Sequence, residues 1–279
     1  MRLTRSGLRP LLLGLGTVLG LRRAGFFVPH RYAASVRPQA YPGLEPRFEA
    51  ALPSFSEVLQ EIERQGPALA RLRGPAPEPR FDQSWFPRLD AAAAYAMVCR
   101  VQPRRILEVG SGHSTRFLAR AIRDRNLPTE LTCIDPAPRA ALEGLPVRWI
   151  RSLLQDVPPS CIEDLRAGDV LFIDSSHVLM PGTDVDRILN GILPALSTGV
   201  LVHFHDVFLP DPYPERWAWR GYNEQSAIAA LLQGGAFEIA FASHWIATRR
   251  PGCLARSILA ELPLEARGLE SSLWLVKRT

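Results

Sequence analysis

Short apolar runs alternate with amphipathic stretches over the last two thirds of the chain. Seven runs are mostly apolar and are expected to form strands: 105–109, 131–134, 147–150, 170–173, 200–204, 237–241 and 273–276. Between them, apolar residues recur at helical spacing in four stretches: 85–101, 114–125, around 185–192, and 222–232. Apolar strands that alternate with helices are typical of a parallel sheet covered on both faces. The pattern therefore predicts an α/β fold with a doubly wound, mostly parallel seven-stranded sheet.

The first 80 residues follow a different pattern. Residues 10–21 form an apolar patch, and residues 54–73 predict one helix with a thin apolar stripe. Three prolines at 75, 77 and 79 then mark a stiff linker. We therefore expect two parts with a boundary near Arg80. Residues 1–80 would be a basic and apolar arm with one helix and a Pro-rich linker, and residues 81–279 the folded domain.

Charge is distributed unevenly between these parts. The chain has 33 Lys and Arg residues against 28 Asp and Glu residues, a formal net charge of +5. Residues 1–44 contain no acid and seven arginines: Arg2, Arg5, Arg9, Arg22, Arg23, Arg31 and Arg37. The remainder is therefore slightly acidic and lacks the basic surface that nucleic-acid binding requires. No nucleic-acid partner is expected.

The apolar patch at residues 10–21 is shorter than the roughly 20 residues that a helix needs to span a bilayer. Three interpretations stay open: a helix that docks on the body or frays, an arm that contacts a membrane or a protein through residues 1–23, and a signal peptide without a clear Ala-x-Ala cleavage site. The four cysteines form no Cys-x-x-Cys pair. We therefore expect no disulfide framework and a reducing, cytoplasmic location.

The stretch from Arg105 to Thr115 reads Arg-Ile-Leu-Glu-Val-Gly-Ser-Gly-His-Ser-Thr, a strand that turns through two glycines into a capped helix. Such a turn lets backbone N–H groups approach a nucleotide-like ligand closely. A dinucleotide site would place a third glycine where Thr115 stands. The carboxylate of Glu108 would repel a pyrophosphate but suits a ligand with cationic groups, as the sulfonium and ammonium of S-adenosylmethionine are.

This stretch resembles motif I of the class I S-adenosylmethionine-dependent methyltransferases, whose pattern is Glu/Asp-x-Gly-x-Gly. Together with Gln-Ser-Trp-Phe-Pro at residues 83–87, it is similar to a bacterial subgroup that acts on sugars and other hydroxylated small molecules. The resemblance covers roughly residues 82–278. It implies a Rossmann-like sheet with an antiparallel seventh strand, and S-adenosylmethionine as cofactor. The implied cofactor-binding residues are Glu108, which would contact the methionine ammonium, Gly110, Ser111, Gly112, His113, Ser114, Asp135 and Asp174.

Asp135 ends the second expected strand, 23 residues after Gly112. An acid at this place can accept both hydroxyls of a ribose, which makes it a second anchor for adenosine. The alternative is an aspartate that only begins the turn before Pro136.

Two polar clusters end the fourth and fifth expected strands. Asp174-Ser175-Ser176-His177 stands where the methyl acceptor would meet the sulfonium, and methyl transfer to a hydroxyl releases a proton that an imidazole can take. The alternative for His177 is a capping or partly exposed residue. His203-Phe204-His205-Asp206 supplies a second acid. The expected catalytic residues are His177, Asp206 and Asp174, and the choice of His177 or Asp206 as the base stays open.

A divalent ion such as Mg²⁺ is a further alternative, because two acids and His205 could bind one, as in metal-dependent O-methyltransferases. Those proteins commonly have two consecutive acids at the second position, and here the first of the pair is His205. The metal ligands therefore stay unassigned. Substrate hydrogen bonding and a purely structural role are the other interpretations of this cluster.

The sequence thus predicts S-adenosylmethionine-dependent methyl transfer to a small-molecule acceptor, most simply a hydroxyl oxygen. The aromatic segment 209–222 is expected to be a substrate lid or else a packed loop. Two rival functions are a nicotinamide-dependent oxidoreductase on a similar sheet and a non-catalytic binding protein that keeps the fold. The acceptor and the oligomeric state stay open.

Overall fold

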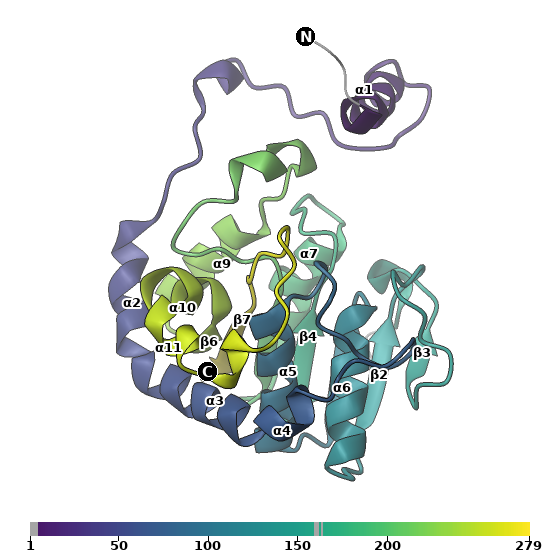
Figure 1. Ribbon diagram of the computed structural model, residues 1–279. Coiled ribbons are helices and arrows are strands. Elements are labelled where there is room, and N and C mark those ends of the chain that lie inside the picture. The colour runs from purple at the N-terminus through teal and green to yellow at the C-terminus, as the bar shows by residue number, and fades with distance from the viewer. Residues whose placement is uncertain (1–4, 159–161, 163) are drawn as a thin grey trace. The chain divides into compact units, whose positions relative to one another are not determined.

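The computed structural model describes residues 5–158, 162 and 164–279, which fall into two compact units (Figure 1). The first unit comprises Met1–Gln39 and Tyr213–Gly221. It contains helix α1 (Arg5–Val18) and the short helical turns η1 (Ala33–Ser35) and η6 (Glu215–Arg220). The second unit, which we term the body, comprises Ala40–Pro212 and Tyr222–Thr279 and contains the sheet.

Seven strands form one sheet in the order β3-β2-β1-β4-β5-β7-β6. Their bounds are β1 (Arg105–Val109), β2 (Glu130–Ile134), β3 (Arg148–Ile150), β4 (Val170–Ile173), β5 (Leu201–Phe204), β6 (Phe237–Ala242) and β7 (Leu273–Lys277). The pairs among β1 to β5 are parallel, and β7 is antiparallel to both β5 and β6. The expected doubly wound, mostly parallel seven-stranded sheet with an antiparallel seventh strand is confirmed.

The strand order reverses between β1 and β4, and this reversal places the helices on both faces. Helices α5 (Arg88–Val101) and α6 (His113–Asp124) lie side by side over the sheet (Figure 1). The connection from β4 to β5 runs in the opposite direction to the one from β1 to β2. Because such crossovers are right-handed, its helix covers the other face. The carboxyl ends of β1 and β4 therefore border a crevice, the usual ligand site of this architecture.

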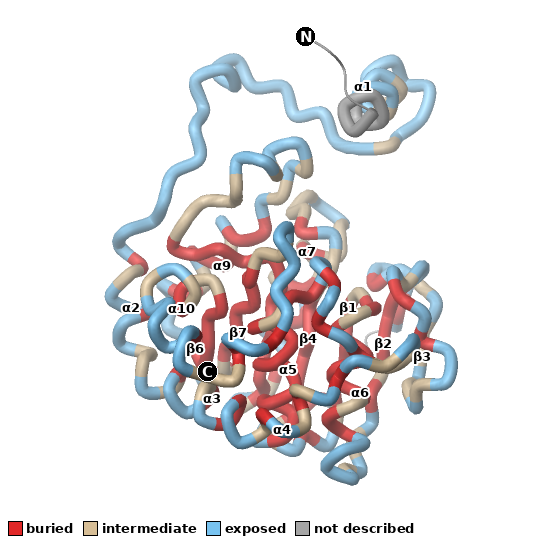
Figure 2. The backbone as a smooth tube through the Cα atoms, viewed as in Figure 1, coloured by how far each residue is buried: buried red, intermediate tan, exposed pale blue. Residues whose placement is uncertain are grey.

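The core runs through the middle of the sheet, as the red segments show (Figure 2). Every residue of β4 and β5 is buried, including Phe172 and Phe204. Burial on both faces explains why these strands appear in the sequence as continuous apolar runs rather than alternating ones.

The expected helix around 185–192 is divided into three pieces: α7 (Asp184–Arg187), a π-helical turn η5 (Ile188–Ile192) and α8 (Leu193–Ala195). Pro194 has no N–H to donate to the carbonyl four residues before it, so regular α-helical bonding cannot continue through this region. The apolar face still packs inward, because Val185 and Ile188 are fully buried.

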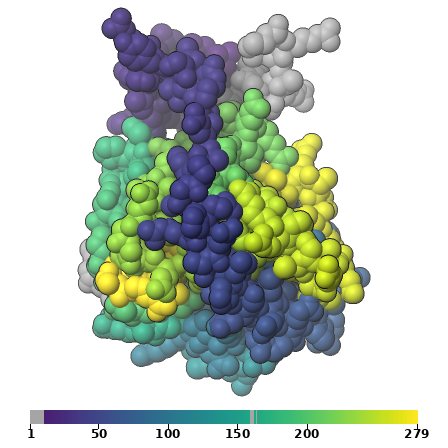
Figure 3. Space-filling view, turned by 90° about the vertical axis from the view of Figure 1, so that its left-hand side faces the viewer, coloured from purple at the N-terminus to yellow at the C-terminus, as the bar shows by residue number. Residues whose placement is uncertain are grey.

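Residues 40–80 belong to the body, so the boundary expected near Arg80 lies inside this unit. Three helices form here: α2 (Glu45–Ala50), α3 (Leu52–Arg64) and α4 (Gly66–Leu69). Phe48 and Phe55 are completely buried and their rings contact Trp245 at centroid distances of 6.4 and 5.7 Å. The helices α2 and α3, in dark blue, lie on the face of the body turned to the viewer (Figure 3). These helices are integral to the core, not part of a separate arm.

The last third of the body contains α9 (Glu224–Gln233), α10 (Ser243–Arg249) and α11 (Pro251–Ala255). The sequence pattern predicts α9 but neither α10 nor α11. The described residues of the body also form short helical turns at η2 (Pro42–Leu44), η3 (Leu154–Asp156) and η7 (Ile258–Ala260).

Candidate active site

The turn after β1 is shaped by a close contact with the end of β4. Gly110 has a positive φ of 79°, and a Cβ at this position would lie 1.8 Å from the carbonyl oxygen of Asp174. Only glycine can occupy this position without moving β1 away from β4. The turn then leads into α6, where the N–H of Gly112 donates to Oγ1 of Thr115 at 2.9 Å. The expected glycine turn at a helix N-terminus is therefore present.

The carboxylate of Glu108 is completely buried beneath this turn. Its Oε1 accepts from the hydroxyl of Ser114 at 2.6 Å, and its Oε2 accepts from the hydroxyl of Thr115 at 2.6 Å and from the thiol of Cys133 at 3.1 Å. Burial raises the pKa of Glu108 to about 7, although these three hydrogen bonds lower it. Glu108 therefore ties strand β1 and strand β2 to the first turn of α6. A contact between Glu108 and the ammonium of the cofactor stays a prediction.

The substitution Glu108→Gln is expected to remove a pH dependence of the free energy of unfolding. Between the ordinary pKa of 4.5 and the folded pKa of about 7, the folded wild-type protein holds a proton that the unfolded chain releases. The wild type should therefore lose up to about 3 kcal/mol as the pH rises through this window, and the glutamine variant should not. Urea unfolding at pH 5 and pH 8 measures the difference. The control is Glu130→Gln, a change at an exposed acid. An equal change in the free energy of unfolding between pH 5 and pH 8 in Glu108→Gln and wild type would contradict the raised pKa of Glu108.

Asp135 closes the same turn from the end of β2. Its Oδ2 accepts from the N–H of Ser111 at 2.6 Å and from the Ser111 hydroxyl at 3.1 Å, and its Oδ1 accepts from the N–H of Ala137 at 2.7 Å. Each carboxylate oxygen has two lone pairs, so these bonds leave capacity for a ribose hydroxyl. The ribose contact stays a prediction, while the place of Asp135 beside the glycine turn agrees with it.

Two buried polar atoms near this turn have no hydrogen-bond partner among the described residues: Nδ1 of His113 and Oγ of Ser175. Buried polar groups normally have partners, so unpaired ones beside a glycine turn suit a polar ligand. Burial lowers the pKa of His113 to about 4, so its ring is neutral near pH 7. The residues around the turn therefore fit the adenosine and amino-acid parts of S-adenosylmethionine.

A second cluster lies at the carboxyl ends of β4 and β5, where the sequence predicts the catalytic residues. Nε2 of His177 lies 3.4 Å from Oδ1 of Asp174 and 3.6 Å from Oδ2 of Asp206. Nδ1 of His205 lies 3.5 Å from a carboxylate oxygen of each of the same two aspartates. The structure thus brings together His177, Asp174 and Asp206. The side chain of Asp174 is 32% exposed, against 10% or less for the other three, so a substrate can reach it most easily.

The backbone at this cluster is strained. His177 and Asp206 have positive φ values of 58° and 56°, which are uncommon for residues with side chains. Such conformations persist where surrounding contacts enforce them, and they concentrate at functional sites.

Two buried carboxylates that the sequence analysis missed hold the histidines in place. Glu224, in the first turn of α9, contacts Nδ1 of His177 through Oε2 at 2.9 Å. Asp90, in the first turn of α5, contacts Nε2 of His205 at 3.3 Å and accepts from the backbone N–H groups of Ser271 and Ser272. Asp90 stands between Leu89 and Ala91, and an acid within an apolar helix is a signal that could have revealed it, whereas Glu224 has polar neighbours and gives no such signal.

The charges in this cluster favour protonated histidines. Burial alone would lower the pKa of His177, but hydrogen bonds with Asp174 and Glu224 and the charge of Asp206 outweigh it and raise this pKa well above 6.5. His205 behaves alike, since the charges of Asp206 and Asp174 outweigh burial and raise its pKa. Burial opposes ionisation of Asp174, yet the two histidines hold its pKa well below 3.8. The site thus combines several carboxylates with two imidazolium groups.

His203 lies in β5, two residues before His205, but has a different role. Its ring stacks on Phe172 at a centroid distance of 3.7 Å, and its Nε2 pairs with Oγ of Ser272 at 2.8 Å. Burial, with the charge of His205, holds its pKa well below 6.5. His203 is therefore a neutral packing residue.

Over the described part of the chain, no group of three or more His, Cys, Asp or Glu side chains is arranged to hold a metal ion. The alternative of a divalent ion at Asp174 and Asp206 therefore gains no geometric support, and the metal ligands stay unassigned.

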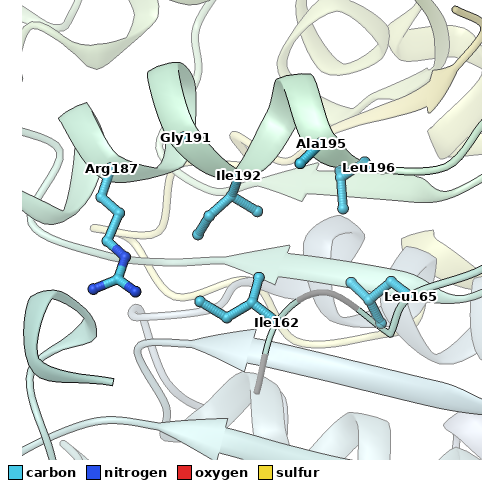
Figure 4. Close-up of a pocket in the computed structure, with 7 residues that line it drawn as sticks. All are labelled: Ile162, Leu165, Arg187, Gly191, Ile192, Ala195 and Leu196. Carbon is cyan, nitrogen blue, oxygen red and sulfur yellow. The ribbon is translucent and has the colours of Figure 1, made fainter. Parts of the chain in front are cut away.

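A pocket of about 160 Å³ lies between the helical segment 187–196 and the side chains of Ile162 and Leu165 (Figure 4). Its lining is apolar except for Arg187, whose guanidinium donates to the carbonyls of Leu154, Gln155 and Val157. None of the predicted site residues lines this pocket, so it does not form part of the candidate active site.

Comparisons with known proteins relate the part of the chain that contains this site to a protein family. Residues 107–207 match a family model described as a methyltransferase domain. This range begins within β1 and ends just after Asp206, so it contains the glycine turn, Asp135 and the cluster at β4 and β5. A comparison with curated proteins found no match.

Solved structures with a similar chain trace include several methyltransferases. An S-adenosylhomocysteine-bound methyltransferase of Podospora anserina, PaMTH1, has 18% sequence identity and a TM-score of 0.44, with 91% of this chain and 100% of that chain covered. An O-methyltransferase of Bacillus cereus in complex with S-adenosylhomocysteine has 16% identity and a TM-score of 0.43, with 80% and 91% covered. Likenesses at these values carry no conclusion about substrate or reaction.

The family match, the sheet order and the turn after β1 agree. Residues 107–207 match a methyltransferase domain, and the sheet order and the glycine turn are those expected of a class I S-adenosylmethionine-dependent methyltransferase. The match supports the expected methyltransferase domain, and S-adenosylmethionine as cofactor stays a prediction.

Proposed function

We propose that this enzyme transfers the methyl group to a hydroxyl oxygen of a small molecule and that His177 is the general base. The observation that carries the proposal is the two-sided environment of the His177 ring. Its Nδ1 is held by the buried Glu224 at 2.9 Å, while its Nε2 faces Asp174 and Asp206 at 3.4 and 3.6 Å. A short contact fixes Nδ1, while only longer contacts reach Nε2. This is the arrangement expected of a histidine that is oriented to act as a base.

The longer distances at Nε2 matter for the chemistry. At 3.4–3.6 Å these contacts are weaker than ordinary hydrogen bonds, so an acceptor hydroxyl can insert between Nε2 and a carboxylate. The bound cofactor supplies an electrophilic methyl group and a positive sulfonium. The carbon–oxygen bond would form as the methyl carbon–sulfur bond breaks, the electron pair of that bond would stay on sulfur, and the alcohol proton would go to Nε2 of the neutral His177. Asp174, the most exposed member of the cluster, is placed to orient the acceptor.

His177 must lose its own proton before it can act as a base. The raised pKa of His177 keeps the ring protonated near neutral pH in the absence of ligands. A cation close to the ring lowers its pKa, so a bound cofactor with a positive sulfonium favours the neutral form. Positioning of the acceptor supplies the rest of the rate enhancement, because the displacement spreads charge rather than creating it.

For the cofactor we propose that backbone groups of Gly110–Ser114 and the side chains of Glu108 and Asp135 form its site. The two unpaired atoms, Nδ1 of His113 and Oγ of Ser175, support this arrangement. Glu108 acts there chiefly through Ser114 and Thr115, which it holds in place.

The experiment that tests the reaction uses S-adenosylmethionine with a labelled methyl group and pairs of acceptors on one scaffold, one with a hydroxyl and the other with a primary amine. Phenols, catechols and monosaccharides are the first scaffolds. Label is expected in hydroxyl compounds and not in their amine partners. Transfer to amines alone would overturn O-methylation while leaving methyl transfer intact. Cofactor binding without transfer to any acceptor of either class would overturn the proposed acceptor class.

A further inference from the structure

A larger share of the large apolar side chains is exposed in segment 11–37 than in the body. On α1, the side chains of Leu11, Leu12, Leu15 and Val18 are 44–60% exposed. The exposure continues beyond the helix at Leu19, Leu21, Phe26, Phe27 and Val28, which are 49–78% exposed. The tube drawing shows this stretch as an almost uninterrupted exposed segment (Figure 2). Contiguous apolar exposure of this kind marks an interaction surface.

The exposed large apolar side chains of α1 share one broad face. Leu11, Leu12, Leu15 and Val18 are spaced i, i+1, i+4 and i+7, which spans about 120° of a helix. The other side at this end of the helix carries Gly14, Gly16 and Thr17 together with the half-buried Leu13. A partner helix would require a narrower seam. A broad face is the form that lies flat in the interface of a bilayer.

Basic residues accompany this apolar face. Arg22, Arg23, Arg31 and Arg37 are all exposed, and the sequence up to residue 44 contains no acid. The guanidinium carbon of Arg23 lies 5.9 Å from the centroid of the Phe26 ring, so an aromatic side chain and a positive charge are neighbours. Arginines next to exposed aromatic residues match a surface of lipid tails and anionic headgroups.

The helix is too short to cross a bilayer. The 14 residues of α1 extend over about 21 Å, against about 30 Å of hydrocarbon. Nowhere in residues 5–158, 162 and 164–279 does a helix have the length and apolar character needed to cross a membrane. The geometry suits a helix that lies on a membrane.

We propose that the segment 11–37 binds the surface of an anionic phospholipid bilayer. The exposed apolar face of α1 and Phe26–Val28 enter the interface, and Arg22, Arg23, Arg31 and Arg37 contact the headgroups. Binding of this kind would hold the methyltransferase body at a membrane surface, where hydrophobic acceptors with a hydroxyl group concentrate.

The test is sedimentation of the full chain with two kinds of vesicle, phosphatidylcholine alone and an equal mixture with phosphatidylglycerol. The protein is expected to pellet with the mixed vesicles, and less so at high salt because the headgroup attraction is screened. Arg22→Gln/Arg23→Gln should reduce the partition coefficient about thirtyfold. Leu12→Gln/Leu15→Gln should reduce it at least about tenfold.

A matched control is Arg71→Gln/Arg73→Gln, which removes the same charge from two exposed arginines of the body. It should leave partition near the wild-type value. Equal binding to both vesicle types without a salt effect, or loss of binding in the control, would overturn the proposal. A change of oligomeric state in Leu12→Gln/Leu15→Gln would show that a second copy covers the face instead. Titration of S-adenosylmethionine into each variant separates failure of membrane binding from failure of the enzyme.

Discussion

Replacing Gly110 by alanine is expected to abolish cofactor binding and to destabilise the body. A Cβ at Gly110 would lie 1.8 Å from the carbonyl oxygen of Asp174 and 2.7 Å from its carbonyl carbon. Both atoms belong to the backbone at the end of β4, so no side-chain rotation relieves the clash. The paired strands β1 and β4 must separate, which should cost about 3–5 kcal/mol in the free energy of unfolding. Titration calorimetry and urea unfolding measure the two effects.

The matched control for Gly110→Ala is Gly168→Ala. Gly168 has a similar positive φ of 85°, but a Cβ there meets no atom within 4 Å. Its substitution carries only the backbone cost, about 1–2 kcal/mol, and lies before β4, away from the cofactor turn. Equal destabilisation in both variants, with cofactor affinity preserved in Gly110→Ala, would show that the close contact between the strand ends is unimportant.

The sheet could be predicted from the sequence because its central strands are buried on both faces. The runs expected at 170–173 and 273–276 coincide with β4 and β7 to within one residue. A parallel strand that is buried on both faces is apolar at most positions, and such a run stands out against amphipathic helices. The glycine turn was visible for a similar reason, since a strand, two glycines and a capped helix follow one another directly in the chain.

Contacts between distant segments could not be predicted in the same way. The helices α2 and α3 carry only a thin apolar stripe, so residues 40–80 were expected to lie outside the folded domain. Their burial depends on Phe48 and Phe55 meeting Trp245, almost 200 residues away. Nothing in the local pattern specifies that partner.

The residues of the candidate site also differ in how far they could be predicted from the sequence. Asp174, His177, His205 and Asp206 follow strand ends, and adjacent parallel strands bring their carboxyl ends together. Glu224 and Asp90 come from helices, 47 and 115 positions from the histidines that they contact. A single acid in a helix gives no indication of its target, although an acid on an apolar helix face must find a partner when it is buried.

The electrostatics of the body also depend on these buried acids. A sequence-level count makes the remainder of the chain only slightly acidic. The structure concentrates Asp90, Asp174, Asp206 and Glu224 around two histidines at one edge of the sheet. Acidic residues that are far apart in the sequence therefore lie close together at the site. Their negative charge raises the pKa values of His177 and His205.

Substitution of His177 by asparagine is expected to lower kcat about 10²–10⁴-fold, with little change in the affinity for S-adenosylmethionine. The acceptor identified in the labelling experiment serves as substrate. For wild type, the rate should rise with pH through a pKa above 6.5, because the base must be neutral and the acids around it hold its proton. A variant that keeps full kcat would assign proton transfer to another group, with Asp206 the next nearest.

Glu224→Gln separates the role of Glu224 from simple support of the fold. Removing this negative charge from Nδ1 lowers the pKa of His177, so the rising limb of the rate profile should move to lower pH. A merely structural role would reduce kcat or stability without moving that limb. The control is Glu238→Gln, an exposed acid on β6 that pairs with Arg278 and should leave the profile in place. If the rising limb of the rate profile stays at the wild-type pH in Glu224→Gln, then Glu224 does not set the proton affinity of His177. In that case His177, held by Glu224, is not the catalytic base.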